Sequence, residues 1–297
     1  MKTDRRTLLA GLGALGVMAC TPSVSKAAPF DTELALGDLE ARHGGRLGVC
    51  GSNSQGRVFW RADERFGYCS TFKLFLAAAT LERAQHGDER LDRAIRITAA
   101  DMLNHAPVTQ PAIGKDLTIE QLCQAAVGES DNPAANILTR EMGGLQALSA
   151  YYVDLGDRFT RFDRPEPHLN TALADDPRDT TGPAQTVRNL AAVFQGERLT
   201  VESLDLLEGW MVASTPGPNR MKAGVPEGWR VAHKTGTGSN GATNDIGILS
   251  PADGEPILAA VYFTEAPDAS MANREAVIAE ATRRLVASFS PTWPGRT

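Results

Sequence analysis

The strongest constraint on the fold is the position of the β-strand patterns, which occur near both ends of the chain and enclose a long helical middle. Helical patterns dominate from about 71 to 212, and amphipathic patterns predict further helices over 31–45 and 271–289. Short apolar runs bounded by turn residues predict five strands, in segments 46–53, 56–63, 229–237, 243–251 and 256–265.

Strands at both ends of a chain form one sheet most simply when the middle is an insertion. We therefore predict an α/β (α+β) domain over 31–290 with an antiparallel five-stranded sheet flanked by helices. The sheet part is built from both termini, over about 31–61 and 213–290, and an all-α subdomain is inserted over about 62–212. An active site is expected in the cleft between the two parts.

The first 27 residues have the pattern of a secretory signal peptide. A basic start at Arg5-Arg6 precedes a short apolar stretch, which is too short to span a bilayer. The paired arginines resemble a twin-arginine export signal and predict a periplasmic protein. Two cleavage positions fit, near 19/20, which would leave a lipid anchor on Cys20, and near 27/28, which would leave a soluble protein.

Composition excludes several functions. A net charge of −6 gives no electrostatic basis for binding nucleic acid. The 5 histidines are scattered without metal-ligand spacing and no C-x-x-C is present, so we expect no metal. Two G-x-G-x-x-G matches, at 11–16 and 236–241, lack the strand, helix and acidic residue of a dinucleotide site, and we expect no cofactor.

Ser70 and Lys73 lie three residues apart, at the start of a strongly apolar segment. Lys73 could pack its stem and keep its ammonium in water. Alternatively, it faces Ser70 one helical turn away and removes the proton of the hydroxyl. The same S-x-x-K spacing occurs at Ser23 and Lys26 in the signal segment, so the spacing alone decides nothing.

Two further motifs follow. Ser130-Asp131-Asn132 precedes a helix, where it can present a hydroxyl and an amide to a substrate or simply cap the helix. The segment 234–237 reads Lys-Thr-Gly-Thr on a predicted strand, where glycine permits close backbone approach.

The three motifs together, S-x-x-K, S-D-N and K-T-G, resemble the penicillin-recognising serine enzymes. The segment 161–183 resembles the omega loop of class A β-lactamases, with Glu166, Leu169 and Asn170 matching E-x-x-L-N. Arg164 and Asp179 match the pair that bridges the neck of that loop. The resemblance covers about 31–290.

The resemblance implies a role for each matched residue. Ser70 attacks the β-lactam carbonyl, and the backbone amides of Ser70 and Thr237 form the oxyanion hole. Lys73 or Glu166 is the acylation base, and Ser130 protonates the lactam nitrogen. The remaining roles fall to Asn132 for the substrate side-chain amide, Lys234, Thr235 and Thr237 for its carboxylate, Glu166 and Asn170 for the deacylating water, and Asn136 for support of Glu166.

The chain departs from the family pattern at several positions. Many class A enzymes carry an arginine after the turn that follows the K-T-G strand, and this chain has none there. Arg220 matches an alternative arginine that supports carboxylate binding in some members. His105 stands where an aromatic residue usually walls the site, and His168 replaces an acidic residue of the loop. In members of the family that form disulfides, the cysteines equivalent to Cys69 and Cys123 pair with cysteines at the positions of Gly238 and Ala77. This chain lacks both partner cysteines, so we expect no disulfide.

The resemblance therefore implies hydrolysis of penicillins and cephalosporins through a Ser70 acyl-enzyme, conferring antibiotic resistance, by a monomer that needs neither metal nor nucleic acid. Activity on carbapenems is left open. A D,D-peptidase or penicillin-binding protein shares the three motifs but forms long-lived acyl-enzymes, and it would lack a working Glu166 and Asn170. A β-lactam-sensing receptor domain would also stay acylated, and it would normally lie beside a transmembrane segment. A serine glutaminase has S-x-x-K but not the E-x-x-L-N loop.

Overall fold

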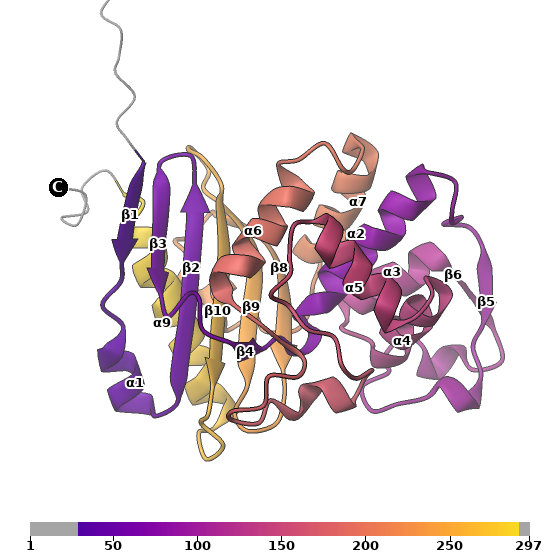
Figure 1. Ribbon diagram of the computed structural model, residues 1–297, viewed down its shortest axis with the longest axis horizontal. Helices are drawn as coiled ribbons and strands as arrows, with labels where there is room; N and C mark the ends of the chain where they lie inside the picture. The colour runs from indigo at the N-terminus through magenta and orange to yellow at the C-terminus, as the bar shows by residue number, and fades with distance from the viewer. Residues whose placement is uncertain (1–28, 291–297) are drawn as a thin grey trace, which may run out of the picture.

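The computed structural model describes residues 29–290 and has a six-stranded mixed sheet as its central layer. The strand order is β1-β3-β2-β10-β9-β8, and β8 is the edge that faces the helical part (Figure 1). The strands span Phe30–Glu33 (β1), Arg46–Asn53 (β2), Gly56–Trp60 (β3), Arg230–Thr237 (β8), Thr243–Ser250 (β9) and Ile257–Thr264 (β10).

The expectation of five antiparallel strands was wrong at the N-terminus. The segment expected to be helical from residue 31 begins as strand β1, which pairs in parallel with β3, and the helix α1 is only Gly37–His43. Phe30–Glu33 alternates between half-buried and exposed side chains, as an edge strand does. The next apolar residues, Leu34 and Leu36, are buried in the core. Their burial in an extended segment outweighs the helical pattern of the sequence.

Helices cover both faces of the sheet. The C-terminal helix α9 (Met271–Ala287) packs on β9 and β10 in a core that contains Val49, Val231 and Leu249. Helix α6 (Pro183–Phe194) covers the opposite face, whose residues continue into the larger core of the helical part. Alternate residues of β8 and β9 therefore face two different environments.

The chain between β3 and β8 is mainly helical, and apart from α6 and α8 (Met221–Gly224) its helices lie beside the β8 edge (Figure 1). Two pairs of short strands also occur in it: β4 (Phe66–Gly67) with β7 (Thr180–Thr181), and β5 (Ala94–Arg96) with β6 (Asp116–Thr118). Its other helices are α2 (Phe72–Gln85), α3 (Ile119–Gly128), α4 (Asn132–Glu141), α5 (Leu145–Asp154), α7 (Val201–Val212) and α8 (Met221–Gly224).

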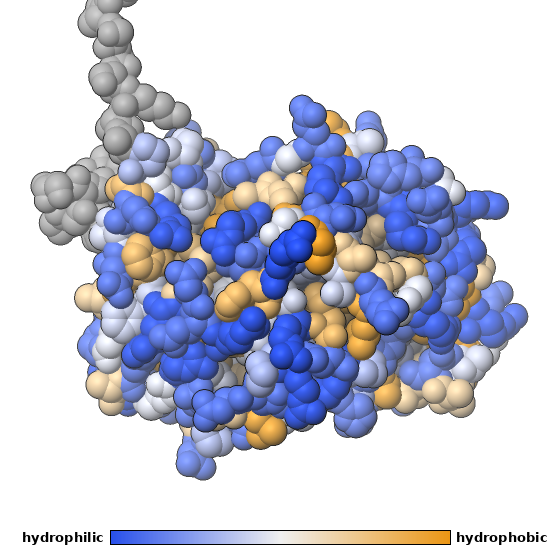
Figure 2. Space-filling view, viewed as in Figure 1, coloured by the Kyte–Doolittle hydropathy of each residue, from blue (hydrophilic) through white to orange (hydrophobic). Residues whose placement is uncertain are grey.

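The surface is mostly hydrophilic on the face seen in Figure 2, where hydrophobic residues form only small, separate patches. Within residues 29–290, no helix combines the length and the apolar character that a membrane crossing requires. The expected signal peptide, its cleavage positions and Cys20 lie outside the described residues.

Candidate active site

Ser70 lies in a 3₁₀ turn, Cys69–Thr71, that leads directly into α2. The turn is stabilised by Thr71, whose hydroxyl donates to the carbonyl of Tyr68 at 2.8 Å. Strand β8 runs very close to it, since a Cβ on Gly236 would lie 2.8 Å from that same carbonyl. The glycine of the K-T-G motif therefore permits β8 to approach the backbone of the turn that carries Ser70.

Lys73 is fully buried, so its ammonium does not reach water. Its Nζ donates to the backbone oxygen of Ser130 at 2.8 Å and to Oδ1 of Asn132, and it lies 3.0 Å from Oε1 of Glu166. Burial lowers the pKa of Lys73 below its ordinary value, and the charge of Glu166 opposes that effect. Lys73 thus joins the first two motifs to the omega loop.

The structure confirms the helix-cap interpretation of the S-D-N triplet for Asp131. Asp131 caps α4 by accepting from the amide of Ala134 at 2.9 Å. Ser130 adopts a positive φ of 58°, a conformation that costs energy for a residue with a side chain. Its hydroxyl accepts from Nζ of Lys234 at 3.0 Å, which connects the helical part to the sheet.

Glu166 belongs to the omega loop and its side chain is fully buried. Its Oε1 accepts a hydrogen bond from Oγ of Ser70 at 3.4 Å, and its Oε2 lies 2.5 Å from Nδ2 of Asn170. The side chain of Asn136 holds the Glu166 backbone at both ends, since it donates to the carbonyl at 2.9 Å and accepts from the amide at 3.1 Å. The Glu166–Pro167 peptide bond is cis.

The neck of the omega loop is closed by Arg164 and Asp179, whose Nε and Oδ2 atoms lie 2.6 Å apart. The Asp179 carboxylate is fully buried and also accepts from the backbone amides of Asp163 and Arg164 and from the hydroxyl of Tyr68. Charge and hydrogen bonds are therefore both satisfied, as a buried carboxylate requires.

On the sheet side, Lys234, Thr235 and Thr237 lie on β8, next to Arg220. The guanidinium of Arg220 is almost fully buried and donates to Oγ1 of Thr237 at 2.8 Å, while Thr237 itself is exposed. Burial lowers the pKa of Lys234 well below its ordinary value. The four residues form a cationic site with an open threonine at its edge.

Sequence reasoning missed the acidic partner of Arg220. Glu275, on α9, lies 3.2 Å from Nε of Arg220. The two residues are separated by 55 positions and no motif contains both, so only the packing of α9 on the sheet brings them together.

His105 lies at the other side of the site in a left-handed conformation, with φ of 61°. Its Nε2 lies 2.9 Å from the backbone oxygen of Glu129, which holds the ring in place. It borders an open hollow of about 670 Å³ that Pro167, the neighbour of Glu166, also lines. His168 begins the following 3₁₀ turn of the omega loop, His168–Thr171.

The expected absence of disulfides is confirmed for the described residues, in which Cys50, Cys69 and Cys123 are free and buried. Gly238 lies against Cys69, since a Cβ there would approach Sγ to 2.7 Å. No cluster of three or more His, Cys, Asp or Glu side chains within residues 29–290 is placed to hold a metal ion.

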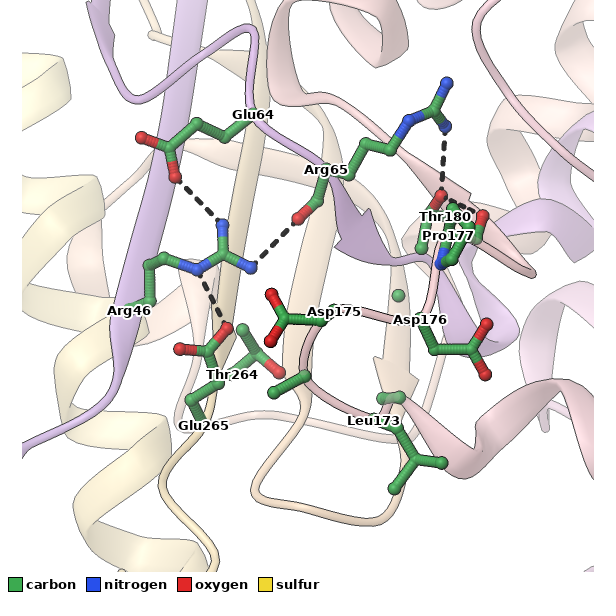
Figure 3. A pocket seen from close by; sticks show the side chains of 13 residues that line it. Arg46, Glu64, Arg65, Leu173, Asp175, Asp176, Pro177, Thr180, Thr264 and Glu265 are labelled. Atoms are coloured by element: carbon green, nitrogen blue, oxygen red, sulfur yellow. Dashed lines mark hydrogen bonds and ion pairs between the residues drawn. The ribbon is translucent and has the colours of Figure 1, made fainter.

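A second cavity, of about 470 Å³, lies between the end of the omega loop and the sheet and contains none of the expected site residues (Figure 3). Its charges are largely paired: Arg46 lies between Glu64 and Glu265, and Arg65 donates to the hydroxyl of Thr180. The cavity therefore does not gather catalytic groups.

Comparisons with known proteins agree with this geometry. Residues 32–289 match the model of the family described as "Beta-lactamase enzyme family". A β-lactamase from Citrobacter koseri is 36% identical over 286 residues, which cover 95% of this chain and 97% of that protein. The solved structure of an ancestral class A β-lactamase matches with a TM-score of 0.83 and 46% identity, covering 86% of this chain and 98% of that one. A putative class A β-lactamase from Rhodopseudomonas palustris matches with a TM-score of 0.82 and 40% identity, covering 85% and 97%.

Proposed function

Because the chain belongs to the class A serine β-lactamases and so is a hydrolase of the β-lactam amide bond, we propose that it opens the ring through a covalent ester on Ser70. The proposal rests on the carboxylate of Glu166, which contacts both Ser70 and Lys73. Oε1 of Glu166 lies 3.4 Å from Oγ of Ser70 and 3.0 Å from Nζ of Lys73, where water is excluded from both charged side chains. A nucleophile beside two groups that can take its proton is the arrangement that covalent catalysis needs.

In acylation, Oγ of Ser70 attacks the β-lactam carbonyl carbon and its proton passes to Lys73 or Glu166. The low pKa that burial gives Lys73 favours the neutral amine, which can accept that proton. The carbonyl oxygen becomes negative and is bound by the amides of Ser70 and Thr237. The C–N bond then breaks, and the Ser130 hydroxyl, whose oxygen accepts from Lys234, gives its hydrogen to the nitrogen. The base that took the proton of Ser70 returns a proton to Ser130, so the base and Ser130 both end in their starting protonation states.

In deacylation, a water molecule attacks the ester carbon, its proton passes to Glu166, and Ser70 leaves with a proton restored. Asn170 supports this step, because its Nδ2 holds Oε2 of Glu166 and its buried Oδ1 has no hydrogen-bond partner among the described residues. A buried acceptor of this kind is satisfied by a water donor. Asn170 and Glu166 are therefore suited to hold one water from two sides.

Substrate binding uses both sides of the site. Lys234, Thr235, Thr237 and Arg220 receive the substrate carboxylate through charge-assisted hydrogen bonds. The amide of Asn132 is held by Lys73 at its oxygen and by the carbonyl of Asn104 at its nitrogen, which leaves one acceptor site and one hydrogen for the substrate's side-chain amide. His105 walls the outer side.

We further propose that the protein is exported to the periplasm as a monomer. The support is the N-terminal pattern, with Arg5-Arg6 before a short apolar stretch and with cleavage near 19/20 or 27/28. Cleavage at the first position would leave a lipid on Cys20. Intact-mass measurement of the protein isolated from cells distinguishes the two mature forms.

A turnover assay with a penicillin, a cephalosporin and a carbapenem tests the function. We expect repeated turnover of the penicillin by the wild-type chain and none by Ser70→Ala. If wild-type protein reacts only once and the acyl group persists in its mass spectrum, the chain acts as a D,D-peptidase or sensor does, and the proposal is wrong. The relative rates for the three drug classes define the substrate range of the enzyme.

A further inference from the structure

A buried histidine–aspartate pair takes no part in the mechanism above. His233 on β8 and Asp245 on β9 are completely buried, and Nδ1 of His233 lies 2.9 Å from each carboxylate oxygen of Asp245. The register pairs Asp245 with Thr235 and His233 with Gly247. Both side chains therefore lie on the sheet face opposite to that of Lys234, toward α8 and α9.

Asp245 also holds a third segment. Its Oδ2 accepts from the backbone amide of Met221, the first residue of α8, at 3.1 Å. Arg220 is the residue directly before it, and its guanidinium donates to the carbonyls of Gly236 and of Asn244, the neighbour of Asp245. One carboxylate thus fixes the backbone next to Arg220 against the two strands that receive its side chain.

The charge state of the pair follows from its hydrogen bonds. Nε2 of His233 is buried and has no partner within residues 29–290. A protonated ring would place a second N–H there without an acceptor, which is costly in a buried site. His233 is therefore neutral with its hydrogen on Nδ1, and Asp245 keeps a full negative charge.

That charge acts on the carboxylate site. Burial and the nearby cations Lys73 and Arg220 lower the pKa of Lys234, and Asp245 is the larger of the two carboxylate influences that oppose them. The Asp245 carboxylate, on the opposite face of the sheet, therefore helps Lys234 remain an ammonium.

We propose that His233 and Asp245 are positioning residues for the substrate carboxylate: Asp245 anchors Arg220 through Met221 and supports the charge of Lys234, and His233 orients Asp245. The inference rests on the proposed function, because it requires Arg220 and Lys234 to bind the carboxylate of a β-lactam. Neither residue contacts the substrate itself.

The test compares benzylpenicillin with its methyl ester, which lacks the anion, using Asp245→Asn and His233→Leu. For the acid we expect KM to rise by about tenfold or more, as for a lost charged hydrogen bond, with kcat changed by less than about threefold. For the ester we expect no change in kcat/KM. His233→Asn, whose amide can still donate to Asp245, should restore most of the wild-type KM for the acid.

Two controls separate positioning from general destabilisation. Asp157 is equally buried and accepts from Asn189 and from the amides of Phe159 and Thr160, away from this site, so Asp157→Asn should lower Tm without changing KM. In an Arg220→Ala background, Asp245→Asn should have a smaller effect than in the wild type, because the part of the effect that passes through Arg220 is already lost.

The inference is overturned if folded His233→Leu and Asp245→Asn keep the wild-type KM for the acid, or if acid and ester lose activity equally. If Asp245→Asn does not fold, the comparison of His233→Leu with His233→Asn decides alone. Wild-type protein that fails to hydrolyse benzylpenicillin in the same assay refutes the proposed function instead.

Discussion

Replacing Glu166 with alanine should convert the hydrolase into a trap for its substrate. The acyl-enzyme ester is removed only by a water that is held in line and loses its proton as it attacks. Glu166 is the carboxylate that contacts Ser70 in this structure. Acylation should survive the change, because Lys73 remains within the same site.

The size of the effect follows from the lack of a substitute base. The nearest other buried carboxylate of the motifs, Asp131, is occupied by the amides of Ala134, Val108 and Thr109. General-base catalysis contributes about 10²–10⁴-fold, or roughly 2.7–5.4 kcal/mol of activation free energy. With no second carboxylate free to act, we expect a loss of deacylation near the upper end of that range.

The pH dependence of the trap gives a second measurement. In the wild type, Glu166 raises the pKa of Lys73 against the lowering by burial, so its removal should lower that pKa further. A neutral lysine acts as base only above its pKa. The burst rate of Glu166→Ala should therefore rise with pH and level off well below the ordinary lysine value of 10.5.

Stopped-flow hydrolysis and intact-protein mass spectrometry measure both effects. Glu166→Ala should open one equivalent of penicillin and keep it as a covalent adduct on Ser70, and Glu166→Gln should behave in the same way because it has the same shape without the base. Ser70→Ala should show neither burst nor adduct. Turnover by Glu166→Ala at the wild-type rate without an adduct would falsify the assignment of this loop.

Three more outcomes are expected. Arg220→Ala should reduce kcat/KM for penicillins by about 10–150-fold, mostly through KM, as expected for a lost charge-assisted hydrogen bond; an unchanged value would remove Arg220 from the site. Asp179→Asn breaks a buried ion pair and should lower the free energy of unfolding by about 3–5 kcal/mol in denaturant titrations, whereas the exposed Asp175→Asn should leave it unchanged. Burial raises the pKa of each described cysteine to about 12, so a thiol reagent should label none of them in the folded protein at neutral pH and all three after unfolding.

The larger part of the fold followed from local patterns. The strands β2, β3, β8, β9 and β10 were predicted because each is a short apolar run bounded by turn residues. Strand β1 was missed because it has only four residues and owes its conformation to its neighbour. Its amide and carbonyl partners come from β3, to which it lies parallel, and no pattern within Phe30–Glu33 contains that information.

The candidate site divides in the same way. Ser70, Lys73 and Ser130 were found through short motifs, and the structure brings them together with Glu166 and Lys234. The partners that neutralise the cations of the sheet part were not found. Glu275 meets Arg220 through the packing of α9 on the sheet, and Asp245 on β9 binds the amide of Met221 from 24 positions along the chain. Neither contact corresponds to a spacing within a short motif.

The two halves of the site carry separate charges and meet at one hydrogen bond. Lys73 and Glu166 form a buried pair in the helical part, to which the proposed mechanism assigns the proton transfers. In the sheet part, the buried carboxylate of Asp245 lies on the opposite face of the sheet and supports the charge of Lys234. The Nζ atom of Lys234 donates to the hydroxyl of Ser130 at 3.0 Å. An ammonium can only donate, so the hydrogen of Ser130 stays free for the lactam nitrogen while the same ammonium attracts the substrate carboxylate. Binding of the anion and protonation of the leaving group are therefore coupled through one lysine, and Lys234→Ala should lower kcat as well as raise KM, whereas Arg220→Ala should act mainly on KM.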